Sequence, residues 1–271
     1  MRRILYKKVH NIYLDHPHQI RKIFYKSQEW YVKSVKDKIV QEREYKVQEG
    51  LYASGHVPRV TKYSDEGFYE EVLFGRTFLA CDFITDEMVS ALAKTLQTVH
   101  CSIDLADQDM FYDKLKFKNW SYDPVSVLEL VTQNNKESVK GVLDYDAVKK
   151  IATTLKEVLR GFSYQPTIIH GDVSLGNVIV TSENSIYLID WTDCRIDTGM
   201  SDVVQAIHLM KLDDEHKELF LKTYTHSLNF PFFVDYLLLL HELFDHCKSK
   251  RKKEGGISVL CHRIEYMKKY L

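Results

Sequence analysis

The amino-acid sequence predicts an α+β protein of two lobes, with a small β-rich N-terminal lobe in residues 1–75 and a larger, mainly helical C-terminal lobe in residues 76–271. Three observations predict this fold class. The first eighty residues consist mostly of short β-prone runs, and after Gly75 the apolar residues recur at helical spacing. The chain has 271 residues, 45% hydrophobic and 28% charged, which is a globular composition with room for two lobes. Strands followed by helices is the element order of an α+β fold.

The expected N-terminal lobe is a set of short strands with one helix inserted. The helix is expected at about residues 34–53, because apolar side chains recur among charged ones until Ser54 and Gly55 end the pattern. Residues 64–67, Ser-Asp-Glu-Gly, are typical of a turn between two strands. The expected strands are residues 4–9, 12–14, 19–25, 59–63 and 68–73.

The expected C-terminal lobe begins with a helix at residues 87–100, whose apolar side chains form one stripe. Residues 104–141 are polar and irregular, and residues 146–159 predict a second amphipathic helix. Short apolar runs at residues 167–190 predict a loop and a β-hairpin. Three or four further helices are expected from Ser201 onward.

Composition excludes several classes of protein before any motif is considered. Lys and Arg number 37 against 38 Asp and Glu, so bulk charge does not predict a nucleic-acid partner. The longest apolar stretch, residues 230–240, is interrupted by Pro231 and Asp235 and is too short to span a bilayer. No secretory signal precedes the first strands, and the five cysteines contain no Cys-x-x-Cys pair. We therefore expect a cytoplasmic protein with reduced thiols and no membrane partner.

One segment carries the residues that phosphoryl transfer from a nucleotide requires. His170-Gly171-Asp172 is followed by Asn177 five residues later, in a loop between two apolar runs, and Asp190 ends the next run. Such a reaction needs a carboxylate beside the acceptor hydroxyl and oxygen ligands that hold Mg²⁺ against the phosphates. Mg²⁺ prefers carboxylate and amide oxygens, which Asp190 and Asn177 provide. The spacing therefore favours a nucleotide-dependent phosphotransferase.

This segment resembles the aminoglycoside phosphotransferase and choline kinase family, a small-molecule branch of the protein-kinase-like fold. That family has a His-Gly-Asp loop with an Asn five residues on, an Ile-Asp-Trp strand end, and often a further Asp twelve residues later. Asp202 stands twelve residues after Asp190. The resemblance implies that Asp172 is the catalytic base, that Asn177 and Asp190 are Mg²⁺ ligands, and that Asp202 braces the catalytic loop.

The resemblance extends into the N-terminal lobe, where such enzymes pair a strand lysine with a helix glutamate. It implies Lys22 as the lysine that contacts the nucleotide phosphates, with Lys26 and Lys33 as alternatives. Glu44 fits the place of the glutamate best. Its rivals are Glu42 and Glu49.

Residues 68–75 resemble the hinge between the lobes, where the backbone of Glu71 and Leu73 would bind the adenine edge. Two departures bear on the nucleotide. No glycine precedes Gly50, so a Gly-rich phosphate loop is missing, and Glu70 stands where the family usually has an apolar residue at the back of the adenine pocket. ATP is the expected co-substrate and GTP the alternative.

Two further departures separate the chain from protein kinases. Gly171 replaces the arginine that answers an activation-loop phosphate, and Asp190-Trp191-Thr192 replaces Asp-Phe-Gly. A switch built on those residues is absent, so an enzyme that is always active is expected.

The sequence therefore predicts an Mg²⁺-dependent enzyme that transfers the γ-phosphoryl group of ATP to a hydroxyl of a small molecule. On the resemblance, an aminoglycoside-like antibiotic is the first acceptor, with choline, ethanolamine, a macrolide or a methylthio-sugar as alternatives of the same class. A nucleotide-binding pseudokinase is the alternative of a different class. Trp191, Tyr236 and Phe244 could stack on a sugar or a quaternary ammonium. A cationic acceptor would suit the acidic side chains of Asp193, Asp197, Asp213, Asp214, Glu215, Glu242 and Asp245.

Overall fold

The computed structural model divides into two compact units, which are described separately. The first unit comprises Met1–Asn119 and Thr167–Thr225, and the second comprises Trp120–Pro166 and His226–Leu271. The lobe boundary predicted after residue 75 falls inside the first unit and stays a prediction. The structure describes residues 18–102, 125–126, 128–129, 144–159, 167–224, 231–248 and 263–268.

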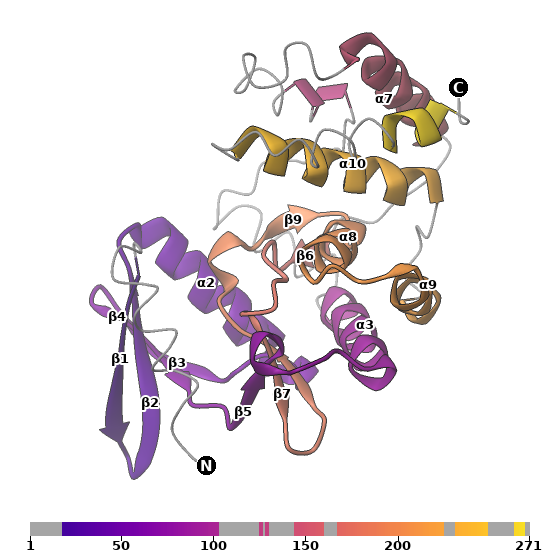
Figure 1. Cartoon of the computed structure of the whole chain (residues 1–271). Helices are drawn as coiled ribbons and strands as arrows, with labels where there is room; N and C mark the ends of the chain where they lie inside the picture. Colours follow the sequence, from indigo (N-terminus) through magenta and orange to yellow (C-terminus); the bar gives the residue numbers. More distant parts are fainter. Residues whose placement is uncertain are drawn as a thin grey trace. The chain divides into compact units, whose positions relative to one another are not determined.

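The N-terminal part of the first unit is a four-stranded antiparallel sheet in the order β1-β2-β4-β3 (Figure 1). Lys26 and Ser27 form the turn between β1 and β2, both with positive φ, as a two-residue hairpin turn requires. Strand β2 therefore lies inside the sheet, between β1 and β4. The strands are β1, His18–Tyr25; β2, Gln28–Val35; β3, Val60–Ser64; and β4, Gly67–Glu71.

Most of the described strands of this sheet were predicted. The strands expected at 19–25, 59–63 and 68–73 are confirmed, with ends that differ by up to two residues. The sequence predicted no strand at residues 28–35, where β2 lies. The strands expected at 4–9 and 12–14 lie outside the described residues.

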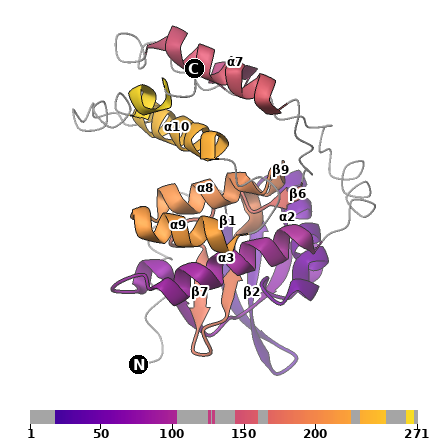
Figure 2. The ribbon, with the colours of Figure 1, turned by 90° about the vertical axis from the view of Figure 1, so that its right-hand side faces the viewer.

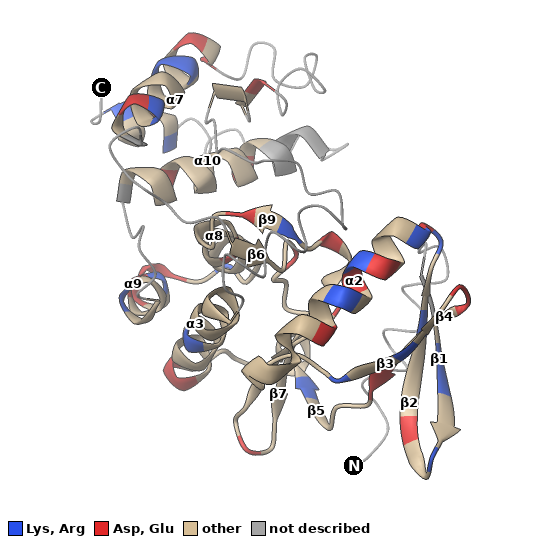
Figure 3. Ribbon diagram, turned by 180° about the vertical axis from the view of Figure 1, so that it is seen from behind, with Lys and Arg blue, Asp and Glu red and all other residues tan. Residues whose placement is uncertain are grey.

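Helix α2 (Lys38–Leu51) follows β2 and contacts both β2 and β3. It begins where the side chain of Asp37 accepts the N–H groups of Ile39 and Val40, so it starts four residues later than predicted. Charges of both signs lie along this helix (Figure 3). Three of its five buried residues are polar, and polar groups buried in this way need partners. The buried residues are Gln41, Glu44, Val47, Gln48 and Leu51.

The rest of the first unit places helices around two small sheets (Figure 2). One sheet has the strand order β5-β7-β8 and includes the predicted hairpin, and the other pairs β6 with β9. Helix α3 packs against α8 and α9. The elements are β5, Gly75–Thr77; α3, Asp86–Cys101; β6, Thr167–Ile169; β7, Val178–Thr181; β8, Ile186–Leu188; β9, Arg195–Asp197; α8, Met200–Leu209; and α9, Asp214–Thr223.

The second unit contains α7 (Tyr145–Leu159) and α10 (Pro231–Lys248), which contact each other. The buried side chains of α7 include Ile151 and Leu155, which confirms the predicted amphipathic helix. No helix among the described residues has the length and apolar character needed to cross a membrane. Most of the irregular segment predicted at 104–141 lies outside the described residues.

Candidate active site

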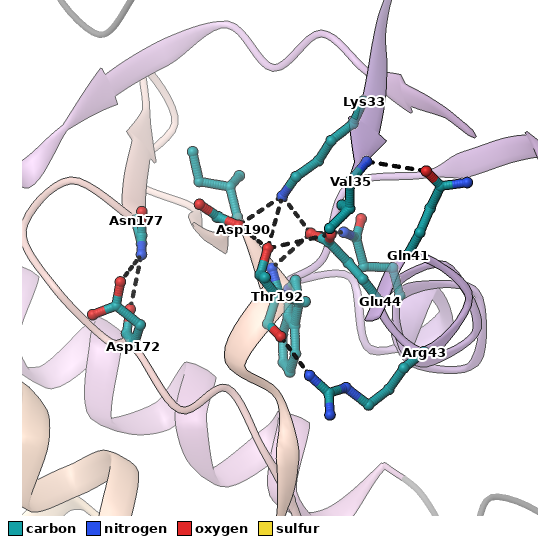
Figure 4. A network of polar contacts seen from close by, with 12 residues as sticks. Lys33, Val35, Gln41, Arg43, Glu44, Asp172, Asn177, Asp190 and Thr192 are labelled. Carbon is teal, nitrogen blue, oxygen red and sulfur yellow. Dashed lines mark hydrogen bonds and ion pairs between the residues drawn. The ribbon is translucent and has the colours of Figure 1, made fainter. Parts of the chain in front are cut away.

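The loop between β6 and β7 brings Asp172 and Asn177 together. The side-chain nitrogen of Asn177, Nδ2, donates to the carboxylate oxygen Oδ2 of Asp172 at 2.7 Å and to the carbonyl oxygen of Asp172 at 3.0 Å (Figure 4). Because both bonds use the amide nitrogen, the amide oxygen of Asn177 is the atom suited to bind a cation.

The β7–β8 hairpin places Asp190 beside this loop. The N–H of Ile189 donates to the carbonyl of Asn177 at 3.0 Å, so Asp190 leaves the hairpin next to Asn177. Asp190 has a left-handed backbone, with φ of 64° and ψ of 72°, which costs a non-glycine residue about 1 kcal/mol or more. Its Oδ1 accepts from the Lys33 ammonium and from the Thr192 hydroxyl, both at 2.6 Å (Figure 4). These bonds hold the carboxylate in place.

The structure corrects the choice of lysine: Lys33, and not Lys22, pairs with Glu44. The side chain of Lys33 is 3% exposed on the inner strand β2 and contacts both Glu44 and Asp190. Lys22 lies on the edge strand β1, is 44% exposed, and pairs with Glu29. Burial alone would lower the pKa of Lys33, but the two carboxylates outweigh it and hold the pKa above its ordinary value.

Glu44 links α2 to the segment that begins with Asp190. Besides the Lys33 ammonium, its carboxylate accepts the backbone N–H of Trp191 at 3.0 Å, and it lies 3.3 Å from the hydroxyl oxygen of Thr192, whose proton faces the nearer Asp190. Its neighbour Arg43 donates to the carbonyl of Thr192 at 2.7 Å. The rivals of Glu44 are engaged on the surface of α2: Glu42 pairs with Lys46, and Glu49 accepts from Tyr45.

Asp202 bonds the backbone of the loop between β6 and β7, the contact that the resemblance implied. Its two carboxylate oxygens accept the N–H groups of His170 at 2.7 Å and Gly171 at 2.9 Å. Its carboxylate also contacts the ring of His100 at 3.0 Å.

Burial raises the pKa of Asp172, and the nearby Asp193 and Asp190 raise it further, while His170 opposes them. A raised pKa makes Asp172 a better proton acceptor at neutral pH.

Glu71 and Leu73, which the resemblance implied as hinge residues, lie at and just after the end of strand β4. The N–H of Glu71 donates to the carbonyl of Arg59 at 2.8 Å, so this N–H is already bonded within the protein. Leu73 follows in the connection to β5. Contacts of Glu71 and Leu73 with a base stay a prediction.

Several residues considered for acceptor binding have other roles. Trp191 is fully buried against the His170 ring and donates from Nε1 to the carbonyl of Leu188, so it cannot stack on a substrate. Tyr236 is likewise fully buried. The carboxylate of Glu242 accepts from Arg263 at 2.7 Å, and Asp213 caps α9. Asp197 is buried, whereas Asp193 is exposed. The side chains of Phe244 and Asp245 lie outside the described residues.

Glu70, which stands where the family usually has an apolar residue, is a buried carboxylate. It is 7% exposed on β4, and within the described part of the chain its Oε2 meets no hydrogen-bond partner. Burial raises the pKa of Glu70 from 4.5 to about 7, with Lys33 opposing and Glu44 adding to the rise.

Glu70→Gln is expected to remove a pH dependence from the stability of the protein. Because the folded state raises the pKa of Glu70, it binds the proton more tightly than the unfolded chain, and stability falls as the pH rises from 4.5 through about 7. The parent should therefore lose up to about 3 kcal/mol relative to the variant, at about 1.36 kcal/mol per pKa unit. Urea unfolding at pH 5 and pH 8 measures the difference. Glu66→Gln, at an exposed position, should leave the pH dependence unchanged; parallel curves for the parent and Glu70→Gln would contradict the expectation.

The donor set fits Mg²⁺ in kind, since Asn177 and Asp190 offer an amide and a carboxylate oxygen. The described residues contain no group of three or more His, Cys, Asp and Glu side chains arranged to hold a metal. If Asn177 and Asp190 bind Mg²⁺, nucleotide phosphates and water would have to complete the coordination.

Comparison with known proteins identifies the family of the chain. A model of the choline/ethanolamine kinase family matches residues 30–210, which is 181 of the 271 residues. The ethanolamine kinase of Plasmodium vivax is 15% identical, with a TM-score of 0.61, covering 94% of this chain and 85% of that one.

Two further solved structures extend the comparison. Choline kinase LicA of Streptococcus pneumoniae is 15% identical, with a TM-score of 0.59, covering 98% of this chain and 99% of that one. A spectinomycin phosphotransferase, solved with ADP and spectinomycin, is 13% identical, with a TM-score of 0.54, covering 95% and 91%. At these identities the likeness shows the fold, and it confirms the predicted fold class with its β-rich N-terminal part and mainly helical remainder.

Proposed function

Since the chain belongs to the choline/ethanolamine kinase family, we propose that it transfers the γ-phosphoryl group of ATP to the hydroxyl group of a small amino alcohol. The match to the family model confirms the family that was predicted from the loop carrying Asp172, and with it a kinase-like phosphotransferase. One observation supports the reaction above the others. The loop pair Asp172 and Asn177 lies beside Asp190, which in turn contacts Lys33.

Each of these residues has one role in the proposal. Asp172, half-buried and with a raised pKa, orients the acceptor hydroxyl and takes its proton. Asn177 and Asp190 would hold Mg²⁺, which when bound neutralises charge on the transferred phosphoryl group. Lys33, held by its ion pair with Glu44, contacts the phosphates of ATP, which is the role of the strand lysine in kinases. GTP is the alternative nucleotide.

The acceptor class follows from the family match, which favours choline or ethanolamine. An aminoglycoside, the acceptor first expected from the sequence, is the second candidate and is supported by the likeness to the spectinomycin phosphotransferase. The exposed Asp193 near Asp172 suits a cation in either case. We place the enzyme in the cytoplasm, where ATP is plentiful.

A coupled ADP-release assay tests this proposal. Choline, ethanolamine, spectinomycin, kanamycin and a methylthio-sugar are each offered with ATP and with GTP, and turnover above the rate without acceptor is expected for an amino alcohol. Asp172→Asn is expected to lower kcat by about 100-fold to 10,000-fold, since a positioned base contributes that much. Full activity of this variant would contradict the role of Asp172. Nucleotide binding without ADP release from any acceptor would favour the pseudokinase.

A further inference from the structure

The side-chain amide of Gln205, on α8, bonds the backbone on both sides of Asp172. Its oxygen Oε1 accepts the N–H of Val173 at 2.9 Å, and its nitrogen Nε2 donates to the carbonyl of Gly171 at 2.9 Å. Gly171 and Val173 are the residues immediately before and after Asp172. One amide therefore spans the residue that would accept the substrate proton.

The orientation of this amide follows from its neighbours. A backbone N–H can only donate and a carbonyl can only accept, so the oxygen of Gln205 must face Val173 and the nitrogen must face Gly171. The site consequently needs a side chain that presents one acceptor and one donor in the same plane. Glutamate offers only the acceptor, and methionine, of similar length, offers neither strongly.

This stretch of the loop is held by side chains. The N–H groups of His170 and Gly171 donate to Asp202, the N–H of Asp172 donates to Nδ1 of His170 at 3.2 Å, and the N–H of Val173 donates to Gln205. Four successive backbone N–H groups thus have side-chain acceptors. Gly171 sits in the left-handed region at φ of +82°, so the chain turns sharply there.

We infer that Gln205 is a positioning residue for Asp172, an inference that rests on the proposed phosphotransferase function. The Asp202 carboxylate fixes the loop before Asp172, but it makes no bond after Gly171, and Gln205 supplies the restraint on the far side. A catalytic group displaced by about 1 Å can lose about 100-fold in rate. Without the amide, Asp172 keeps its charge and its bond from Asn177 but loses its fixed distance to the acceptor hydroxyl.

Two variants separate the two bonds. Gln205→Met removes both, and Gln205→Glu keeps the acceptor for the Val173 N–H while it loses the donor to Gly171. Both are expected to lower kcat about tenfold or more, with the KM for ATP within twofold of the parent, because the nucleotide contacts on Lys33 and Asp190 are untouched. Gln97→Met makes the same chemical change at a half-buried position of α3 and should leave kcat unchanged.

Amide hydrogen exchange provides a readout that does not depend on turnover. In Gln205→Met the Val173 amide should exchange at least about tenfold faster, while the His170 and Gly171 amides, bonded to Asp202, keep their protection. In Gln205→Glu the Val173 amide should stay protected. A uniform rise across all three amides would instead show general loosening and would overturn the inference.

The turnover assay and the exchange measurement together distinguish a failure of this inference from a failure of the proposed function. If the parent releases no ADP with any acceptor, the proposed function is wrong, and with it the positioning role, even though exchange at Val173 would still report the Gln205 bond. If the parent is active, a kcat of Gln205→Met within twofold of the parent, or an unchanged exchange rate at Val173, overturns the positioning role of Gln205.

Discussion

Asp190→Asn should lower kcat by at least about 100-fold, the loss typical of removing one electrostatic group aimed at the transition state. The substitution keeps an oxygen for the Thr192 hydroxyl but removes the negative charge that Lys33 and a bound Mg²⁺ would face. Because the substitution removes a negative charge from the proposed Mg²⁺ site, the affinity for MgATP should fall, while the affinity for ATP without Mg²⁺ should change little. Titration calorimetry with and without MgCl₂, beside kcat at several Mg²⁺ concentrations, measures both effects.

Asp65→Asn is the matched control for this substitution. It makes the same chemical change at an exposed position in the turn between β3 and β4, and kcat and MgATP binding should both remain at the parent level. Should Asp190→Asn retain the parent's turnover and Mg²⁺ dependence, Asp190 would not be a metal ligand.

Lys33→Met is expected to damage stability and activity together. It leaves the buried carboxylate of Glu44 facing Asp190 without the ammonium that both contact. Removing one partner of a buried ion pair costs about 3 kcal/mol or more, because the remaining charge stays desolvated. Protonation of a carboxylate relieves that cost, so the deficit should shrink as the pH falls. Urea unfolding at pH 5 and pH 8 measures the deficit, and the KM for ATP reports the lost phosphate contact.

Lys22→Met distinguishes the two lysines. Lys22 and its partner Glu29 are both more than 40% exposed, so the free energy of unfolding should change by less than about 1 kcal/mol, and the KM for ATP should stay at the parent value. The reverse ranking of the two variants would restore Lys22 as the phosphate contact.

The contrast between these lysines shows what could be predicted from the sequence. The proximity of Asp172, Asn177 and Asp190 could be predicted, because one loop and one hairpin bring them together through local chain geometry. Lys33 could not be chosen over Lys22, because that choice depends on which strand lies inside the sheet, and this is set by long-range pairing with β4. One sequence signal was available: Lys33 stands in a mostly apolar run with Trp30, Tyr31, Val32 and Val35, which favours an inner strand, and the structure buries these four residues.

Helix periodicity and tertiary burial explain why the prediction for Glu44 succeeded and the one for Trp191 failed. Glu44 was chosen on the resemblance, and helix periodicity agrees with that choice because Glu44 shares a face with the apolar Val47 and Leu51, at spacings of three and seven residues. Trp191 was interpreted wrongly as a possible stacking residue, because an aromatic next to a catalytic loop suits either a substrate or the core. Only its contact with the His170 ring decides for the core.

The backbone of Asp190 narrows the residues that can stand at this position. Glycine adopts a left-handed φ of 64° without strain, and asparagine and aspartate adopt it more readily than most other residues. Glycine brings no ligand atom and asparagine brings no charge, so of these three residues aspartate meets both the geometric and the chemical demand. Substitutions meant to stabilise the enzyme or to change its specificity should therefore keep Asp190 and be made in the surrounding strands.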